Sequence, residues 1–291
     1  MGQNGKQTTM TNCQSRLLYL DLMKRSLTNW IYGSAEAELF GQQRAVEIRG
    51  VPGTGLNSIE QRLFDGILRE VQSITVFNPE LRAEGRDWPP TAHTMIGLRR
   101  LDNLQACIED ILARNIPGDL IETGSWRGGA TIFMRAVLKA YGVDDRVVWV
   151  ADSFEGLPAP DPKRYPADFG SVFHLFADLS VTLDQVKANF DRYGLLDDQV
   201  RFLKGWFRDT LPTAPVERLA LARLDGDMYE STIDSLESLY PKLSVGGYLI
   251  VDDYGDIPAC RQAVHDYRRA NSITEAIVPI DSTGIYWQRA R

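Results

Sequence analysis

The stretch D-L-I-E-T-G-S-W-R-G-G at residues 119–129 decides the fold of this 291-residue chain. A short apolar run ends there in a glycine-containing turn, and a helical pattern over about 129–141 follows at once. Later apolar runs, separated by helical segments at about 183–193, 231–240 and 258–270, lie at 147–153, 200–206, 219–225 and 248–254. Continuous apolar strands that alternate with helices are typical of a parallel sheet covered on both faces. We therefore expect an α/β fold.

The two ends of the chain follow different patterns. Strand-like runs at 276–282 and 284–290, joined by a short turn without a helix, predict a final antiparallel hairpin and hence a mostly parallel seven-stranded sheet. The first part is helical, with expected helices at 17–31, from Asn57 or Ser58 to about Val71, and at 97–114. We expect a disordered start at 1–16, a helical region at 17–116 and a sheet domain at 117–291.

Composition excludes several classes of partner. The chain has 32 Lys and Arg against 39 Asp and Glu, a net charge of −7, so its overall field repels nucleic acid. No run approaches the roughly 18–20 apolar residues of a membrane span, and the polar N-terminus lacks the layout of a signal peptide. The three cysteines are scattered and form no zinc pattern. We expect a cytoplasmic protein with neither a nucleic-acid nor a membrane partner.

The turn after the first run has features of a nucleotide-type site. Gly124 permits a tight turn, but Ser125 and Trp126 stand where a dinucleotide fingerprint G-x-G-x-x-G would need glycine. Glu122 lies just before the glycine, where a carboxylate could pair with an ammonium group. The alternative is an ordinary tight turn with an incidental glutamate.

A second carboxylate ends the next run. Asp152 lies at the usual place for an acid that accepts hydrogen bonds from ribose hydroxyls, although aspartate is also a common loop residue. Together with a first turn that lacks pyrophosphate features, it indicates an adenosyl ligand without a diphosphate. S-adenosylmethionine fits that description.

Four carboxylates follow the last two runs of the parallel part. L-D-G-D at 224–227 and V-D-D-Y at 251–254 bring Asp225, Asp227, Asp252 and Asp253 to one sheet edge. Close carboxylates repel each other unless a cation lies between them, and an all-oxygen set favours magnesium over zinc. The alternative is that these acids cap helices or pair with Arg and Lys. Among the histidines, His93 could face the site and His265 is expected to be structural.

Six ordered motifs resemble a known family. They are A-H-T-M-I-G-L-R-R-L-D-N-L (92–104), E-T-G-S-W-R-G-G-A (122–130), D-S-F-E-G-L-P (152–158), R-Y-G-L-L-D-D-Q-V-R-F-L-K-G-W-F (192–207), L-D-G-D-M-Y-E-S-T (224–232) and V-D-D-Y (251–254). Over residues 17–291 the chain resembles the macrocin O-methyltransferases, which methylate sugar hydroxyls of glycosylated natural products such as macrolides and aminocoumarins. The resemblance implies a Rossmann-like class I methyltransferase fold with an N-terminal helical lid.

The resemblance also implies roles for particular residues. Asp225, Asp252 and Asp253 would bind Mg²⁺, and Asp227 would be the general base. The cofactor site would be lined by Thr94, Met95, Glu122, Gly124, Ser125, Asp152, Ser153 and Trp206. Family members commonly have a different small residue at the position of Ser125. The N-terminal helices would supply the lid and the contacts of a homodimer.

We therefore expect an O-methyltransferase that depends on S-adenosylmethionine and magnesium and acts on a sugar hydroxyl of a glycosylated small molecule. The nearest alternative is a magnesium-dependent catechol or phenol O-methyltransferase. An NAD-dependent oxidoreductase would share the sheet and Asp152 but not the four-aspartate edge. A binding protein that has lost catalysis would not be expected to keep all four aspartates.

Overall fold

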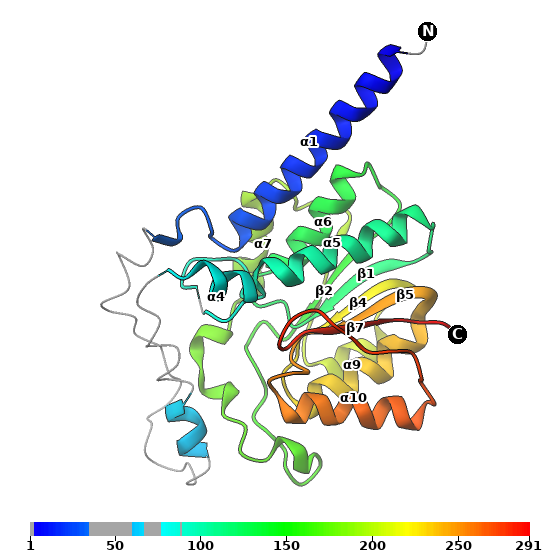
Figure 1. Ribbon diagram of the computed structural model, residues 1–291. Coiled ribbons are helices and arrows are strands. Elements are labelled where there is room, and N and C mark those ends of the chain that lie inside the picture. Colours follow the sequence, from blue (N-terminus) through cyan, green and yellow to red (C-terminus); the bar gives the residue numbers. More distant parts are fainter. Residues whose placement is uncertain (1–2, 35–59, 67–76, 88) are drawn as a thin grey trace.

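A computed structural model describes residues 3–34, 60–66, 77–87 and 89–291 of the chain. Its centre is a seven-stranded sheet in the order β3-β2-β1-β4-β5-β7-β6 (Figure 1). The strands are β1 (Asp119–Thr123), β2 (Val148–Asp152), β3 (Val200–Lys204), β4 (Leu219–Leu224), β5 (Leu243–Val251), β6 (Val278–Pro279) and β7 (Ile285–Gln288). The first five pair in parallel, and β7 pairs antiparallel with both β5 and β6. The α/β fold and the C-terminal hairpin are confirmed.

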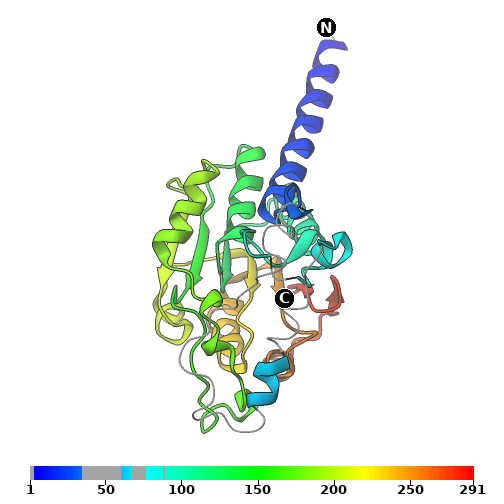
Figure 2. The same cartoon turned by 90° about the vertical axis from the view of Figure 1, so that its left-hand side faces the viewer.

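Helices cover both faces of the sheet (Figures 1 and 2). One core contains side chains of α5 (Gly97–Ala113), α6 (Gly129–Ala140) and α7 (Leu183–Arg192). The core on the opposite face contains side chains of α9 (Tyr229–Leu239) and α10 (Pro258–Ala270), and the short α8 (Phe207–Thr210) contacts α9. The short α8 was not expected, and the other five helices match the expected segments to within a few residues.

Successive side chains of each strand enter the two cores in turn, which explains why the apolar runs in the sequence are continuous. In β1, Leu120 belongs to the first core and Ile121 to the second, and both are fully buried. In β2, Val150 and Ala151 divide in the same way. Successive side chains of a strand point to opposite faces, so a strand covered on both sides needs apolar residues at nearly every position.

The N-terminal helix is longer than its sequence pattern predicts. Helix α1 (Gln3–Leu27) begins within the segment expected to be disordered, and its N-terminal part projects from the body. Its C-terminal half packs on α5 and α6 through buried Leu20, Met23 and Leu27. A short α4 (Pro79–Glu84) was not expected. Of the helix expected from Asn57 or Ser58 to Val71, residues 60–66 are helical, and both of its ends lie outside the described residues.

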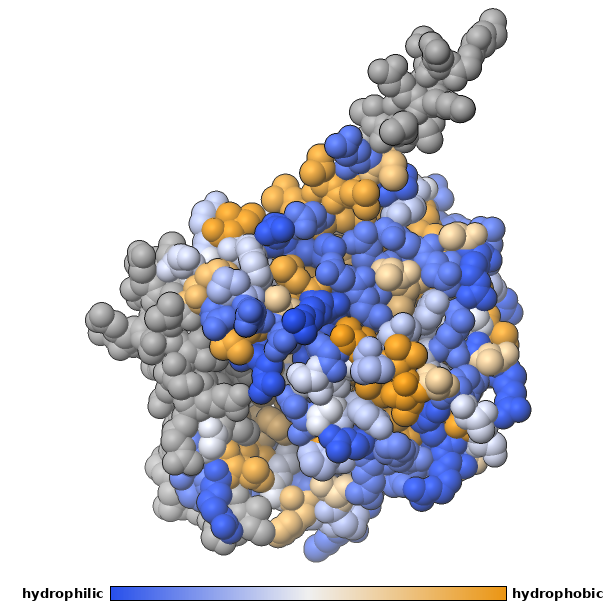
Figure 3. Space-filling model, viewed as in Figure 1, coloured by the Kyte–Doolittle hydropathy of each residue, from blue (hydrophilic) through white to orange (hydrophobic). Residues whose placement is uncertain are grey.

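An apolar patch lies near the base of the projecting helix (Figure 3). Leu17, Leu18 and Leu22 of α1 are 51%, 65% and 55% exposed. In the part of the chain that the structure describes, no helix combines the length and apolar character needed to cross a membrane. Leu17, Leu18 and Leu22 therefore form a local exposed patch on α1.

A long connection, residues 153–181, joins β2 to α7, and we call it the β2–α7 loop. It contains the 3-10 turns η1 (Pro166–Asp168), η2 (Phe173–Leu175) and η3 (Ala177–Leu179). Phe176 in this loop stacks on Phe64 from the N-terminal region, with ring centroids 5.4 Å apart. The N-terminal region and the loop therefore meet beside the carboxyl ends of the strands.

Candidate active site

Two adjoining cavities open at the carboxyl ends of the parallel strands. The first encloses about 760 Å³ and is open to solvent. The second is larger, about 1670 Å³. The two share the lining residues Met95, Gly124, Trp126, Leu179, Asp225 and Asp227. All twelve of the candidate residues derived from the sequence line one cavity or both.

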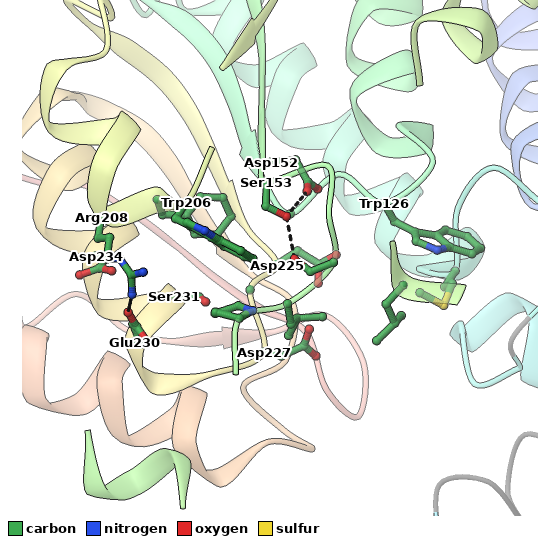
Figure 4. A pocket seen from close by; sticks show the side chains of 18 residues that line it. Trp126, Asp152, Ser153, Trp206, Arg208, Asp225, Asp227, Glu230, Ser231 and Asp234 are labelled. Atoms are coloured by element: carbon green, nitrogen blue, oxygen red, sulfur yellow. Dashed lines mark hydrogen bonds and ion pairs between the residues drawn. The ribbon is translucent and has the colours of Figure 1, made fainter. Parts of the chain in front are cut away.

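Asp152 and two tryptophans shape the first cavity (Figure 4). Trp206, which directly precedes α8, lies on one side, and Trp126 lies on the other with Asp225 and Asp227 between them. The Asp152 carboxylate accepts hydrogen bonds from the backbone N–H of Ser125 at 2.7 Å and of Phe154 at 2.8 Å. Burial raises the Asp152 pKa, and these N–H donors oppose the rise. The carboxylate is thus fixed at the cavity wall.

Ser153 and Trp126 tie this wall to the β2–α7 loop. The Ser153 hydroxyl donates to the Gly156 carbonyl at 2.7 Å. The Trp126 indole N–H donates to the Asp178 carbonyl at 2.8 Å. Trp126 lines both cavities, a role that we did not predict from the sequence, although the aromatic residue in the middle of a glycine-rich turn was a visible signal.

Gly124 is required where the strands β1 and β4 end. Its φ is +86°, and a Cβ there would lie 1.6 Å from the Asp225 carbonyl oxygen. Any side chain would therefore push β4 and its aspartate away from the first turn. The close approach of the two loops brings Ser125 and Asp225 to the same cavity.

Glu122 is the buried acid of this first turn. It is 1% exposed, and its Oε1 binds the Arg223 guanidinium at 2.5 Å. Its Oε2 is buried in the wall of the second cavity without a hydrogen-bond partner among the described residues. Burial raises its pKa to about 8, although the neighbouring guanidinium opposes the rise. An unpartnered buried carboxylate oxygen fits the ammonium group of an amino-acid ligand.

Thr94 and Met95 reach the cavities because helices hold the segment before them. The backbone N–H groups of His93 and Thr94 donate to the Leu27 carbonyl at the end of α1. A Cβ on Gly129, at the start of α6, would lie 2.4 Å from the His93 carbonyl. The N-terminal region is therefore part of the wall of the site.

His93 itself does not line either cavity. Its ring Nδ1 lies 2.8 Å from the Tyr193 hydroxyl, and burial together with Arg127 and Arg192 lowers its pKa to about 4. The suggestion that His93 faces the site was wrong, because the ring packs edge-on against Tyr193 instead. The structural role expected for His265 agrees with its contact to Tyr254, 2.8 Å between Nε2 and the hydroxyl.

Two arginines organise the acids, and we did not predict either from the sequence. Arg223, 2% exposed and next to the last residue of β4, binds Glu122, Asp225 at 2.8 Å and Asp252. Arg100 of α5 binds Asp252 and, at 2.8 Å, Asp281 in the β6–β7 turn. The signal for Arg223 was its position inside an otherwise apolar run, L-A-L-A-R-L-D at 219–225.

The four aspartates therefore divide into two kinds. One oxygen of Asp252 binds Arg223 and the other binds Arg100, and the side chain is almost fully buried. Asp225, Asp227 and Asp253 instead each have a carboxylate oxygen within 4.8 Å of those of the other two. Arginines therefore engage both oxygens of Asp252 but only one oxygen of Asp225, and the three carboxylates that could share a metal ion include Asp227 instead of Asp252.

Electrostatics in this set favour a bound cation. Burial, followed by repulsion from neighbouring carboxylates, raises the pKa of Asp225 to about 6 and that of Asp227 to about 8. The same causes raise the Asp253 pKa well above its usual range. Three carboxylate oxygens at this separation can share one hard divalent ion, which would remove the repulsion. The donor set thus fits Mg²⁺.

The fold and site together are those of a class I methyltransferase. The O-methyltransferase NovP superposes with a TM-score of 0.80 and 45% identity, covering 95% of this chain and all of that one. The calicheamicin methyltransferase CalS11 shares the fold, with a TM-score of 0.56 and 18% identity, over 82% of this chain and 99% of that one.

Sequence comparison defines the family. The macrocin O-methyltransferase family model matches residues 16–289. The 8-demethyl-8-(2,3-dimethoxy-alpha-L-rhamnosyl)-tetracenomycin-C 4'-O-methyltransferase of Streptomyces olivaceus is 52% identical over 94% of this chain and 93% of that protein. The mycinamicin III 3''-O-methyltransferase of Micromonospora griseorubida is 49% identical over 94% and 96%. The demethyldecarbamoylnovobiocin O-methyltransferase of Streptomyces niveus is 54% identical over 75% and 83%. The chain belongs to the macrocin O-methyltransferase family and is an O-methyltransferase.

Proposed function

We propose that this enzyme transfers the methyl group of S-adenosylmethionine to a sugar hydroxyl of a glycosylated natural product, with Mg²⁺ at the acid cluster. The observation that carries the proposal is the grouping of Asp225, Asp227 and Asp253, of which Asp225 and Asp227 line both cavities and Asp253 lines the second. A donor that extends from the first cavity to Glu122 and an acceptor in the rest of the second cavity would meet at these carboxylates.

The donor side follows from the chemistry of the first cavity and of the wall of the second cavity at Glu122. S-adenosylmethionine supplies an electrophilic methyl group on a sulfonium. Asp152 has the acceptor oxygens for ribose hydroxyls, and Trp206 offers an aromatic face for the base. The free Oε2 of Glu122 would accept from the amino group. Glu122 and Asp152 thereby set the two ends of the bound molecule and orient the part between them.

The acid cluster would hold the metal. Asp225 and Asp253 are the ligands that we propose, and Asp252 would reach an ion only by giving up a contact with Arg100 or Arg223. We therefore assign to Asp252 the orienting of the arginines. A bound Mg²⁺ would lower the pKa of a nearby hydroxyl and fix its position.

Asp227 is the general base in this proposal. It lines both cavities, and its burial raises the pKa of its carboxyl, which makes the carboxylate a better proton acceptor than an exposed aspartate. When the acceptor oxygen attacks the methyl carbon, the carbon–sulfur bond breaks, and the hydroxyl proton passes to the Asp227 carboxylate.

The second cavity would bind the acceptor. Its wall combines acids, including Asp253 and Asp256, with the apolar side chains of Phe173, Leu179 and Ile257. Such a wall suits a neutral sugar, whose hydroxyls would meet the acids, attached to a larger apolar group. Relatives at about half identity carry names that describe glycosylated acceptors, which supports the same substrate class.

The acceptor class is tested by mass spectrometry. Purified enzyme is incubated with S-adenosylmethionine, Mg²⁺ and a panel of deoxysugar glycosides, with a simple catechol in parallel. We expect one glycoside to gain one methyl group and the catechol to stay unchanged. Methylation of the catechol with no glycoside turned over would establish the alternative phenol chemistry.

We also propose a homodimer formed through α1. The exposed patch of Leu17, Leu18 and Leu22 lies on the solvent side of the helix, whereas Leu20, Met23 and Leu27 pack toward α5 and α6. A second copy of this helix would cover those leucines. Burying apolar area of this kind contributes roughly 25 cal/mol for each Å².

A further inference from the structure

The turn that carries Asp227 has an unfavourable backbone conformation. Asp227 has φ +58°, and the backbone N–H of Met228 donates to the Gly226 carbonyl at 2.6 Å across it. A bond of this kind around a residue with positive φ makes a γ-turn of the rare, strained form. Such a conformation persists only where the surrounding structure holds it. Both ends of the turn must therefore be fixed.

The upstream end is fixed by the sheet. The backbone N–H of Asp225 donates to the Thr123 carbonyl at 2.8 Å, which continues the pairing of β1 with β4. The Asp227 N–H donates to Asp253 Oδ2 at 3.1 Å. Neither contact holds the residues that follow Asp227.

The downstream end is fixed by a residue far away in the chain. Helix α9 starts at Tyr229, and its N-cap residue Met228 makes no side-chain capping bond. The free amides are instead capped by Asp168 of the β2–α7 loop. Its Oδ1 accepts from the Tyr229 N–H at 2.7 Å, and its Oδ2 accepts from the Glu230 N–H at 3.0 Å. Asp168 is 2% exposed, so both bonds are shielded from water.

The loop that carries Asp168 also builds the cavities. Tyr165 stacks on Tyr229 with ring centroids 5.8 Å apart, so the loop is docked on α9 through two contacts. On either side of this anchor, Leu157 and Pro158 line the first cavity, and Leu179 lines both. The position of the loop and the conformation of the Asp227 turn are therefore linked through one buried carboxylate.

We propose that Asp168 is a positioning residue for methyl transfer, which holds the strained turn so that the Asp227 carboxylate stays at the boundary of the two cavities. This inference rests on the proposed role of Asp227. Asp168 does not line either cavity, so we expect it to contact neither donor nor acceptor. Its effect on the reaction passes through the first turn of α9.

The chain offers a matched control in the same loop. Asp161 is exposed and also accepts from two backbone N–H groups, those of Lys163 and Arg164, but it does not contact α9. Comparing Asp168→Ala with Asp161→Ala separates the cap on α9 from a general effect of losing an aspartate from the loop. Asp168→Asn keeps one acceptor oxygen and is the conservative variant. If Asp168→Ala does not fold, Asp168→Asn takes its place in the comparison with Asp161→Ala.

Amide hydrogen exchange, followed by NMR at single residues in the full chain, tests the structural step without reference to catalysis. We expect Asp168→Ala to raise the exchange rates of the Asp227 and Tyr229 amides at least fivefold. Asp168→Asn should raise them less, and Asp161→Ala should leave them unchanged. If exchange at Asp227 is the same in all variants, Asp168 does not hold the turn and the inference is overturned.

Kinetics test the catalytic step. We expect Asp168→Ala to lower kcat tenfold or more with the KM for S-adenosylmethionine within twofold, and Asp168→Asn to recover part of the loss. Faster amide exchange with an unchanged kcat would show that Asp168 only caps α9, and it would refute the positioning role. A wild-type protein that methylates no glycoside would instead count against the proposed function, while the exchange experiment would still decide the structural step.

Discussion

Arg223 and Glu122 lie on neighbouring strands and form a buried ion pair, with 2.5 Å between Nη1 and Oε1. The same guanidinium nitrogen also binds Asp225 at 2.8 Å. One nitrogen therefore joins the acid proposed for the cofactor amino group to an acid proposed for the metal. A planar guanidinium can serve several carboxylates at fixed angles, which a lysine ammonium on a flexible stem cannot.

The first prediction concerns this pair. Arg223→Lys should weaken binding of S-adenosylhomocysteine at least fivefold, because a lysine cannot hold Glu122 while it also binds two aspartates. Arg100→Lys is the matched control, since Arg100 binds Asp252 and Asp281 but not Glu122. Isothermal titration calorimetry measures both affinities. Equal losses in the two variants would show that Glu122 is not oriented specifically by Arg223.

The second prediction concerns Asp152. Asp152→Ala should weaken binding of S-adenosylmethionine severalfold or more, because the ribose loses its acceptor and the Ser125 and Phe154 amides lose theirs. Asp198→Ala, at an exposed position before β3, should bind as the wild type does. An unchanged calorimetric affinity of Asp152→Ala would remove Asp152 from the cofactor site.

The third prediction separates base from ligand. Asp227→Asn keeps the size of the side chain but cannot accept the proton, so kcat should fall by roughly 10²–10⁴ while metal and cofactor still bind. Asp225→Asn should instead weaken metal binding, and added Mg²⁺ should restore part of its activity. If added Mg²⁺ restores the activity of Asp227→Asn but not that of Asp225→Asn, then Asp227 is the metal ligand and Asp225 is the general base.

The metal itself is tested in the same assay. Excess chelator should abolish turnover, and Mg²⁺ should restore it. Asp253→Asn should weaken metal binding more than Asp252→Asn does, because both oxygens of Asp252 are already engaged by arginines. Full activity in excess chelator would rule out the metal.

The fourth prediction concerns pH. The pKa of His93 is lowered from 6.5 to about 4 in the folded protein, so the unfolded chain binds more protons between these pH values. The contribution of His93 to folding stability should therefore fall as the pH drops from about 6.5 to 4, whereas the buried carboxyls with raised pKa values contribute in the opposite direction. His93→Asn cannot take up the proton, so the difference in Tm between the variant and the wild type should shift in favour of the variant as the pH falls over this range. Parallel Tm curves for the two proteins would contradict the assignment.

The fifth prediction concerns assembly. Leu18→Glu should convert a dimer into a monomer by light scattering after size exclusion, because Leu18 is 65% exposed on the α1 patch. Leu196→Glu is the control, at a residue 42% exposed on another surface. A wild-type protein that is already monomeric, or a variant that remains dimeric, would exclude this interface.

The sheet could be predicted from the sequence because its signal is local. Each parallel strand is an apolar run in the sequence. The polar residue at the end of the run marks the carboxyl end of the strand, which is where ligands bind in a parallel sheet. Ten of the twelve candidate residues come together for this reason, whereas Thr94 and Met95 are positioned by the helices of the N-terminal region. The start of α1 could not be predicted, because its first residues are polar and lack the apolar spacing that identified the helix from Leu17 onward.

The roles of Asp252 and Asp168 depend on contacts that no local pattern carries. Asp252 binds Arg100, 152 residues away in the chain, and an adjacent aspartate doublet gives no sign of which member meets an arginine. Asp168 caps a helix 61 residues further on. Side-chain partners at such separations follow from packing, which sequence periodicity does not describe.

The contact between Arg100 and Asp281 also constrains the order in which the protein can be made. Arg100 leaves the ribosome early, whereas the turn that holds Asp281 belongs to the final hairpin. The nascent chain therefore carries Arg100 with only one of its two aspartate partners, Asp252, until translation is nearly complete, and domains generally fold as units. A product that stops before the last hairpin would keep every proposed donor and metal residue, yet it would lack Asp281 and the strand β7 that pairs with β5. Premature termination should thus yield a chain that is less stable than the full-length enzyme.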